Sequence, residues 1–415
     1  MRKVYFPLMV ALIFSACTPQ VPIENHQSSF QEQALEMKIQ GRSFPSVFQA
    51  WYGIDMPQLP RETLSDRLAL AAKHDILWEE PLSQLGEGVD LVLGLEWEGE
   101  HHGLSRSFEK NSLSRALENR QALLTLNPHM VFLMEIRWRD APMSFFPAES
   151  EYWKRDENGK VIEGWLGGWE PFYMLDYDNE AFQDNVAAQA KLALESGVYD
   201  GIMLDWSGHL SIIQKVREAI GEQGLIIVNI HDDIEDGKKY REYINGSFME
   251  LNPLDQSTLT TDDPSLNNLR KWDTIREALL WFEEHLQEPQ INCLEVWGAR
   301  KDLQRMRATS ALALTHSDGY VLYGDPNPLK TPDHLHDWYD FWEVDLGRPT
   351  GELEQLPNQA YRRSYDHGWV YYNHYGNGAV EVKFEQEMRR ISDGQVATSF
   401  RMEDRDGEIF TPLRP

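Results

Sequence analysis

The chain has 415 residues, of which 41% are hydrophobic and 26% charged, an ordinary globular composition that suffices for a large α/β barrel with an appendage. Its 39 lysine and arginine residues stand against 67 aspartate and glutamate residues, which gives a net charge of −28. Such a surface repels phosphate backbones and strongly anionic polymers, which excludes nucleic acid as a partner and favours a neutral or cationic one.

The N-terminus has the pattern of an export signal. A basic "MRK" precedes an apolar run too short for an ordinary membrane span, which predicts a signal peptide over 1–16. The run ends in "FSAC", which resembles the lipobox of bacterial lipoproteins, with Cys17 as the lipidated residue. Thr18 follows in place of an aspartate, so the resemblance implies the outer membrane. A plain secretory signal, and a secreted or periplasmic protein, is the alternative. We expect residues 17–43 to form a polar tether and the lipid to be the sole membrane contact.

From Phe44 onward, short apolar runs alternate with amphipathic stretches. The runs typical of strands are 46–54, 90–97, 130–138, 201–206, 225–232, 247–253, 291–298 and 319–325. The stretches with helical spacing are 61–74, 112–126, 180–196, 211–222, 237–244, 266–286 and 300–316, and a segment beginning at Asp333 closes the series.

Eight strands that alternate with helices predict an α/β fold, a (β/α)8 TIM barrel over 44–345, since near-continuous apolar strands fit a parallel sheet buried on both faces. A doubly wound open sheet is the alternative, although no GxGxxG turn follows any strand. The second strand is ambiguous, because "HDILW" at 74–78 competes with 90–97, which would then contribute at the barrel mouth. Residues 350–415 predict a small C-terminal antiparallel β domain, with turn signals in "GNG" and "RDG".

Polar and aromatic residues recur where the predicted strands end. A TIM barrel has its active site at the carboxyl ends of its strands, so we expect these residues to face one another. The candidates for substrate binding are Trp51, Tyr52, Glu96, Trp97, Glu135, Arg137, Trp138, Trp206, Asn229, Glu295, Trp297 and Asp325. Five of the 14 tryptophans of the chain are in this set. Aromatic faces suit the C–H faces of sugar rings, so this concentration favours a carbohydrate ligand.

Asp205 and Glu250 are the candidate catalytic residues. Asp205 ends the apolar run of "YDGIMLDWSG", and an uncompensated carboxylate there is costly unless it has a use. Glycoside hydrolysis needs two carboxyl groups beside the scissile bond, one as nucleophile or base and one as proton donor. The structural alternatives are a helix cap for Asp205 and an arginine pair for Glu250. Substrate binding and structure remain equal alternatives for Glu295.

A family resemblance rests on "FQAWYGI", "EIRWRD", "WKRDENGKVIEGW", "MLDYDN", "GVYDGIMLDW", "INGSFMELNP" and "LTHSDGYVLYGD". Together they resemble the glycoside hydrolases grouped as hypothetical glycosyl hydrolase family 15, over about residues 44–345. "DGIMLDW" with a later glutamate is also similar to the endo-α-1,4-polygalactosaminidase-like barrels. That second resemblance implies that Asp205 and Glu250 are the catalytic pair, and it leans toward retention of configuration.

The sequence therefore predicts a glycoside hydrolase of a polysaccharide or oligosaccharide, with no cofactor and no metal. One alternative is a glycan-binding lipoprotein without turnover. Another is a metal-dependent hydrolase, although "QAWYGI" lacks the His-x-His expected after the first strand. "HLHD" at 334–337 has metal-like spacing, but we expect it on the solvated face of the last helix. The histidines at 101–102 lie in a polar loop without a partner pattern.

Overall fold

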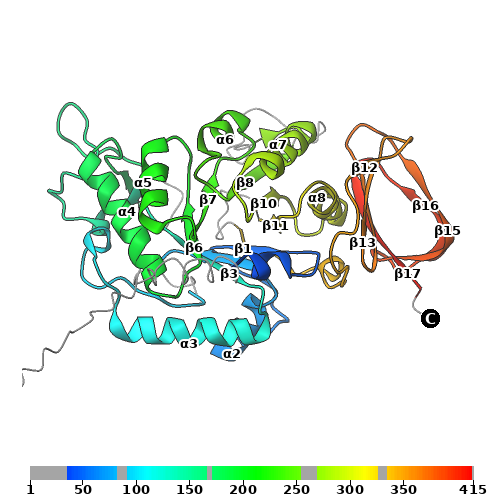
Figure 1. Cartoon of the computed structure of the whole chain (residues 1–415), viewed down its shortest axis with the longest axis horizontal. Coiled ribbons are helices and arrows are strands. Elements are labelled where there is room, and N and C mark those ends of the chain that lie inside the picture. Colours follow the sequence, from blue (N-terminus) through cyan, green and yellow to red (C-terminus); the bar gives the residue numbers. More distant parts are fainter. Residues whose placement is uncertain (1–34, 82–90, 166–170, 254–268, 326–333, 414–415) are drawn as a thin grey trace, which may run out of the picture.

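The computed structural model describes residues 35–81, 91–165, 171–253, 269–325 and 334–413. Within them, eight parallel strands stand side by side in chain order, and a bridge between Val47 and Val321 joins the first to the last (Figure 1). These are β1 (Phe48–Ala50), β2 (Ile76–Glu79), β3 (Val131–Glu135), β6 (Gly201–Leu204), β7 (Leu225–Asn229), β8 (Gly246–Pro253), β10 (Cys293–Trp297) and β11 (Tyr320–Gly324). The predicted TIM barrel is confirmed.

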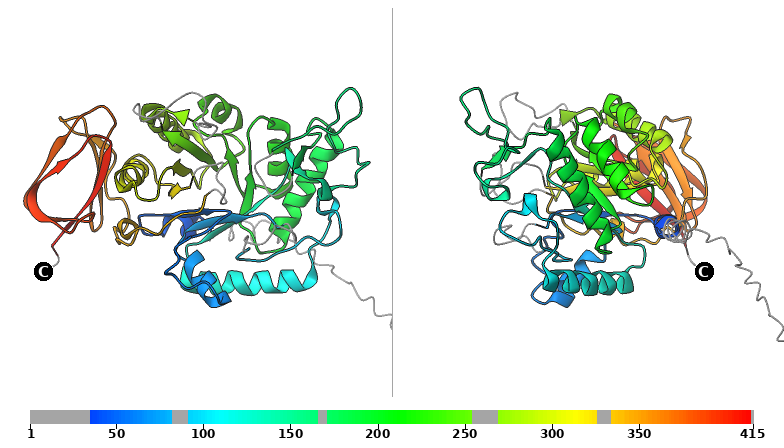
Figure 2. Two further views of the ribbon diagram at one scale, coloured as in Figure 1. Left: turned by 180° about the vertical axis from the view of Figure 1, so that it is seen from behind. Right: turned by 60° about the vertical axis from the view of Figure 1, so that its left-hand side comes forward.

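In the described part of the chain, seven helices alternate with these strands and lie around the outside of the barrel (Figures 1 and 2). They are α2 (Leu64–Ala71), α3 (Lys110–Leu126), α4 (Glu180–Glu195), α5 (Leu210–Ile220), α6 (Ile234–Tyr240), α7 (Trp272–His285) and α8 (Leu303–His316). Helix α5 presents an apolar stripe to the sheet, which consists of Ile212, Ile213, Val216 and Ile220, all buried. A short strand β9 (Leu269–Arg270) extends the end of β8.

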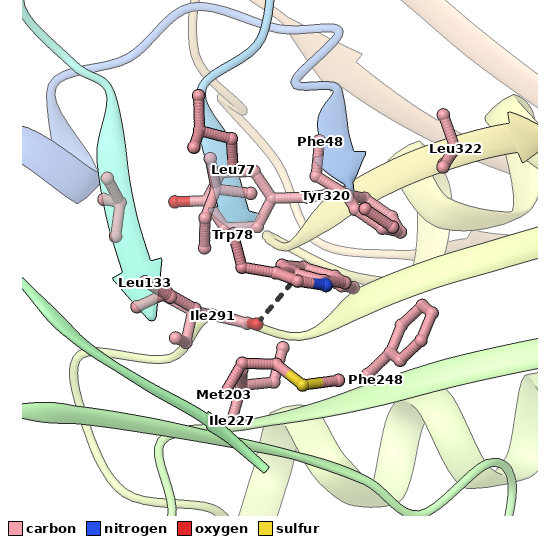
Figure 3. Close-up of a cluster of buried hydrophobic side chains, with 14 of the residues drawn as sticks. Phe48, Leu77, Trp78, Leu133, Met203, Ile227, Phe248, Ile291, Tyr320 and Leu322 are labelled. Carbon is pink, nitrogen blue, oxygen red and sulfur yellow. Dashed lines mark hydrogen bonds between the residues drawn. The ribbon is translucent and has the colours of Figure 1, made fainter. Parts of the chain in front are cut away.

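Large side chains fill the interior of the barrel (Figure 3). The ring of Trp78 lies 5.3 Å from that of Phe48 and 5.0 Å from that of Phe248, and all three side chains are fully buried. The barrel is thus a packed core, and a ligand is accommodated at its ends.

Two predicted elements need correction. The second strand is 76–79, the alternative that we left open, whereas 91–97 contributes only a bridge between Trp97 and Phe108. The apolar character of 91–97 comes from packing outside the barrel. The prediction of a closing helix is also wrong, because the segment from His334 to Pro349 contains a single 3-10 turn, Asp340–Trp342.

The C-terminal antiparallel sheet is confirmed. It comprises β12 (Glu354–Gln355), β13 (Tyr361–Tyr365), β14 (Gly368–Asn373), β15 (Val380–Arg390), β16 (Val396–Met402) and β17 (Asp406–Pro412), in the order β12-β13-β14-β17-β15-β16. The "GNG" and "RDG" turns do not join neighbouring strands, because β17 lies between β14 and β15, and β15 lies between β16 and β17. The hairpins are instead β13–β14 and β15–β16.

Helix α8 lies between the barrel strands and this sheet (Figures 1 and 2). A Cβ atom at Gly407 of β17 would stand 2.2 Å from the Cβ of Ala311, so glycine permits the close approach. Arg307 of α8 donates two 3.0 Å hydrogen bonds to Asp406. Among the described helices, none has the length and apolar character needed to cross a membrane. Cys17 and the predicted signal peptide lie outside the described residues.

Candidate functional site at the carboxyl ends of the strands

Asn229 joins the two candidate catalytic carboxylates. It ends β7, Asp205 follows β6, and Glu250 lies on β8, so three adjacent strands place these side chains at the same end of the barrel. The amide nitrogen Nδ2 of Asn229 lies 2.9 Å from Oδ1 of Asp205 and 2.9 Å from Oε2 of Glu250. Asn229 itself is buried, whereas both carboxylates are partly exposed. One neutral donor thus holds two acidic groups at the mouth.

Asp205 is not a helix cap. The N-cap of α5 is His209, which makes no side-chain capping bond, and Oδ1 of Asp205 accepts from the backbone N–H of Trp206. Burial raises the pKa of Asp205 to about 6, with a further increase from the charge of Glu135. The structure therefore removes the capping alternative and leaves a carboxylate that titrates near neutrality.

A second acidic group stands beside the first, centred on Arg137. This guanidinium forms a bidentate salt bridge with Glu80, with two hydrogen bonds of 2.6 Å. Its Nη1 lies 3.6 Å from Oε1 of Glu135. Trp51 donates its indole N–H to Glu135. Burial raises the pKa of Glu135 to about 7, and it also raises the pKa of Glu80. Arg137 is therefore the positive charge that permits these buried acids.

Glu295 and His334 form a third group. Glu295 of β10 is fully buried and accepts at 2.8 Å from Nδ1 of His334, whose Nε2 lies 3.9 Å from Oε1 of Glu250. This position favours the structural alternative for Glu295 over direct contact with a substrate. His334 is 3% exposed and belongs to the loop after β11, so our placement of "HLHD" on a solvated helix was wrong.

Three further predicted residues, Trp206, Tyr52 and Asp325, lie in different surroundings. Trp206 is 39% exposed at the mouth, with the guanidinium of Arg139 stacked 3.8 Å from its ring. Tyr52 lines a cavity of about 100 Å³ beside Trp51. Asp325 binds Arg300 through two hydrogen bonds of 3.0 and 2.7 Å, which gives it a structural partner.

Four further candidates pair with, or pack against, other groups of the protein. Glu96 pairs with Arg115 of α3 at 2.7 Å, and Trp97 stacks on Phe108, so both pack against the helix layer. Their segment is not a barrel strand, and a role of these two residues in substrate binding stays a prediction. Trp138 packs against Tyr177 and His209, and Trp297 is buried at the end of β10.

Sequence reasoning missed Glu80, His334 and Arg139. Glu80 directly follows the true second strand, so a correct choice of that strand would have identified it. The paired histidines of "HLHD" were a signal, but the wrong helix assignment placed them elsewhere. In the described part of the chain, no group of three or more histidine, cysteine, aspartate or glutamate residues is arranged to hold a metal ion.

Comparison with protein-family models and with curated proteins found no match. The resemblances to the two named families therefore remain predictions. Solved structures do match. A noncanonic maltogenic alpha-amylase, AmyB from Thermotoga neapolitana, aligns at a TM-score of 0.53 and 11% identity, over 91% of this chain and 100% of that one. An alpha-amylase from Malbranchea cinnamomea gives 0.53 and 11%, over 91% and 97%.

A third match is the alpha-amylase from Geobacillus thermoleovorans complexed with acarbose. Its TM-score is 0.50 at 11% identity, over 88% of this chain and 97% of that one. At such identities the likeness establishes the fold. The structural neighbours are glycoside hydrolases, and one of them binds a carbohydrate ligand.

Proposed function

We propose that the chain is a glycoside hydrolase that cleaves O-glycosidic bonds with Asp205 and Glu250. The observation that carries the proposal is the single amide of Asn229 donating to both carboxylates at the mouth of the barrel. This chemistry requires two carboxyl groups that flank the scissile bond. The glycoside hydrolases among the structural neighbours support it at the level of the fold.

The spacing of the two carboxylates supports a retaining mechanism. Two oxygens that each lie 2.9 Å from one nitrogen are at most about 5.8 Å apart. Retaining enzymes place their carboxyl groups about 5–5.5 Å apart, whereas inverting enzymes need about 6.5–9.5 Å to admit a water molecule. The shared amide therefore favours direct attack on the sugar.

In this mechanism Asp205 attacks the anomeric carbon while Glu250 gives its proton to the leaving oxygen. The bond from the sugar to that oxygen breaks, and a covalent glycosyl ester forms on Asp205. Glu250, now ionised, takes a proton from water, and the resulting hydroxide displaces Asp205. Asn229 keeps both carboxylates oriented throughout, since its amide does not titrate.

The charges favour a neutral or cationic sugar. Within the described residues the mouth gathers Glu80, Glu135, Asp205, Glu250 and Glu295, whereas Arg137 and Arg139 supply positive charge there. An anionic sugar would meet this excess and the net charge of −28. The exposed ring of Trp206 offers an apolar face to a sugar bound beside Asp205.

A glycan-library screen of the chain without residues 1–16, with product analysis, tests the function. We expect hydrolysis of a neutral or amino-sugar glycan with retained configuration, abolished in Asp205→Asn and in Glu250→Gln. The matched control is Glu408→Gln, which changes a buried carboxyl group of the C-terminal sheet. Binding without turnover would support the glycan-binding alternative, and activity that a chelator removes would support the metal-dependent one.

A further inference from the structure

His334 occupies a position between two glutamates on neighbouring strands. Glu250 of β8 and Glu295 of β10 are register partners, so their side chains leave the sheet side by side. Two neighbouring like charges repel each other, and Glu295 is fully buried, where an uncompensated charge is costly. The imidazole of His334 lies 2.8 Å from Glu295 and 3.9 Å from Glu250. A proton on His334 would offset both negative charges.

The surroundings of His334 are built to hold it there. A Cβ atom at Gly324 would lie 2.4 Å from Oε1 of Glu295 and 3.5 Å from Cα of His334, so only glycine leaves room for the pair. His334 has a φ of 62°, in the left-handed region that few side chains adopt. Residues held in that region cluster at functional sites, where the surrounding structure enforces them.

Two further histidines anchor the loop. Nδ1 of His336 lies 2.9 Å from the carbonyl oxygen of His334, and its Nε2 lies 2.9 Å from Nε2 of His74, which precedes β2. The backbone N–H of His334 donates to the carbonyl oxygen of Asp325. The ring of His334 also packs 4.9 Å from the ring of Trp51. These contacts fix the direction in which the imidazole points.

We propose that His334 is a positioning residue whose charge, held by Glu295, sets the pH range over which Glu250 keeps and returns its proton. This rests on the proposed role of Glu250 as general acid. An imidazolium beside Glu250 stabilises the carboxylate formed after proton donation. Among the other charges near His334, Asp325, which follows β11, is paired with Arg300, and burial lowers the pKa of His336 to about 4, which leaves His336 neutral. Asp205 faces Glu250 across the shared amide of Asn229.

The first test measures His334 directly and needs no substrate. We would record the histidine resonances of the isotope-labelled chain against pH, and identify His334 by its loss in His334→Asn, since asparagine tolerates the left-handed backbone. Glu295→Gln should lower the titration midpoint of His334 by about one pH unit or more, and Glu250→Gln by less, because its oxygen is farther away. An unchanged midpoint in Glu295→Gln would overturn the proposal.

The second test uses turnover on a substrate found by the glycan screen. His334→Asn should move the alkaline limb of kcat/KM upward by about one pH unit, because Glu250 then keeps its proton longer. The control is His316→Asn, which removes another buried imidazole at the opposite end of the barrel, before β11. A limb that stays in place would contradict the proposal. If the wild type turns over no glycan, the proposed function fails, and the resonance titration still decides the inference.

Discussion

Among the single residues of the site, Asn229 is the one that connects the two candidate catalytic carboxylates. A neutral amide holds Asp205 and Glu250 together without neutralising either, whereas an arginine in its place would favour the ionised form of both. The pKa of Asp205 is raised because burial disfavours its charged form. Among the contacts described, its hydrogen-bond donors are the neutral amide of Asn229 and the backbone N–H of Trp206. The ionised Asp205 therefore lowers the stability of the fold, and in return it is a more reactive carboxylate.

Asp205→Asn should therefore lose activity and gain stability. Unfolded, the carboxyl group titrates near 3.8, and in the fold near 6. Between these values the native state binds more protons, so stability falls as pH rises toward about 6 and stays low above it. The amide removes this penalty, and we expect a gain of about 1–3 kcal/mol at pH 7, with a rate loss of at least about 10²–10⁴-fold. Thermal unfolding and kcat provide the measurements.

Glu408→Gln is the control that separates the loss of activity from the gain in stability. Burial raises the pKa of Glu408 to about 7, so this variant removes a similar buried charge in the C-terminal sheet. Its activity should equal that of the wild type. An Asp205→Asn protein that is both active and less stable would contradict the assignment of Asp205.

The acid limb of the pH profile should report Asp205. A nucleophilic carboxylate must be ionised, so we expect kcat/KM to fall as pH drops through about 6. The charge of Glu135 contributes to this raised pKa, and Glu135→Gln should move the acid limb to lower pH. A limb that stays fixed in Glu135→Gln would show that another group controls it.

At the scale of elements, the strand ends determine the site and one glycine leaves room for it. Gly324 ends β11, where any Cβ atom would meet Glu295. Gly324→Ala should displace Glu295 and His334, with a loss of stability of about 1–3 kcal/mol from overpacking and a reduced kcat. Chemical denaturation and kinetics are the measurements.

Gly351→Ala is the matched control. A Cβ atom there would approach the hydroxyl oxygen of Ser364, at 2.5 Å, and that side chain rotates freely enough to yield. If Gly324→Ala behaves like Gly351→Ala, the packing between Gly324 and Glu295 does not support the site.

The sequence predicted correctly those elements that are determined by neighbouring residues in the chain. Asp205 follows an apolar strand, Asn229 ends one and Glu250 lies in the second half of one, so their shared position at the barrel mouth was predictable from chain order. The second strand was uncertain because "ILWE" is shorter than the apolar run at 90–97, which packs outside the barrel. His334 was misplaced because contacts far apart in the sequence hold its loop, among them the one between His74 and His336.

At the scale of the whole molecule, the barrel, α8 and the C-terminal sheet follow one another along the longest dimension (Figure 1). The order of strands in that sheet was not predictable, because turn signals identify where the chain reverses and not which strands then pair. The barrel, by contrast, was predictable from eight alternating strands and helices, with a doubly wound sheet as the alternative.

We propose from the sequence alone that the chain is displayed as a lipoprotein. Expressed with residues 1–16 in a bacterial host, the chain should incorporate a labelled fatty acid and fractionate with the outer membrane, and Cys17→Ala should do neither. Equal labelling of Cys17→Ala, or a wild type found only in soluble fractions, would favour the plain secretory signal.

Rescue by azide tests the central claim most directly. With an activated aryl glycoside of the sugar found by the screen, azide should restore turnover to Glu250→Ala and give a glycosyl azide of retained configuration. It should restore turnover to Asp205→Ala with a glycosyl azide of inverted configuration, because azide then replaces the nucleophile. If both variants remain as active as the wild type, or if azide gives the same configuration with both, Asp205 and Glu250 are not the nucleophile and the acid of a retaining glycosidase.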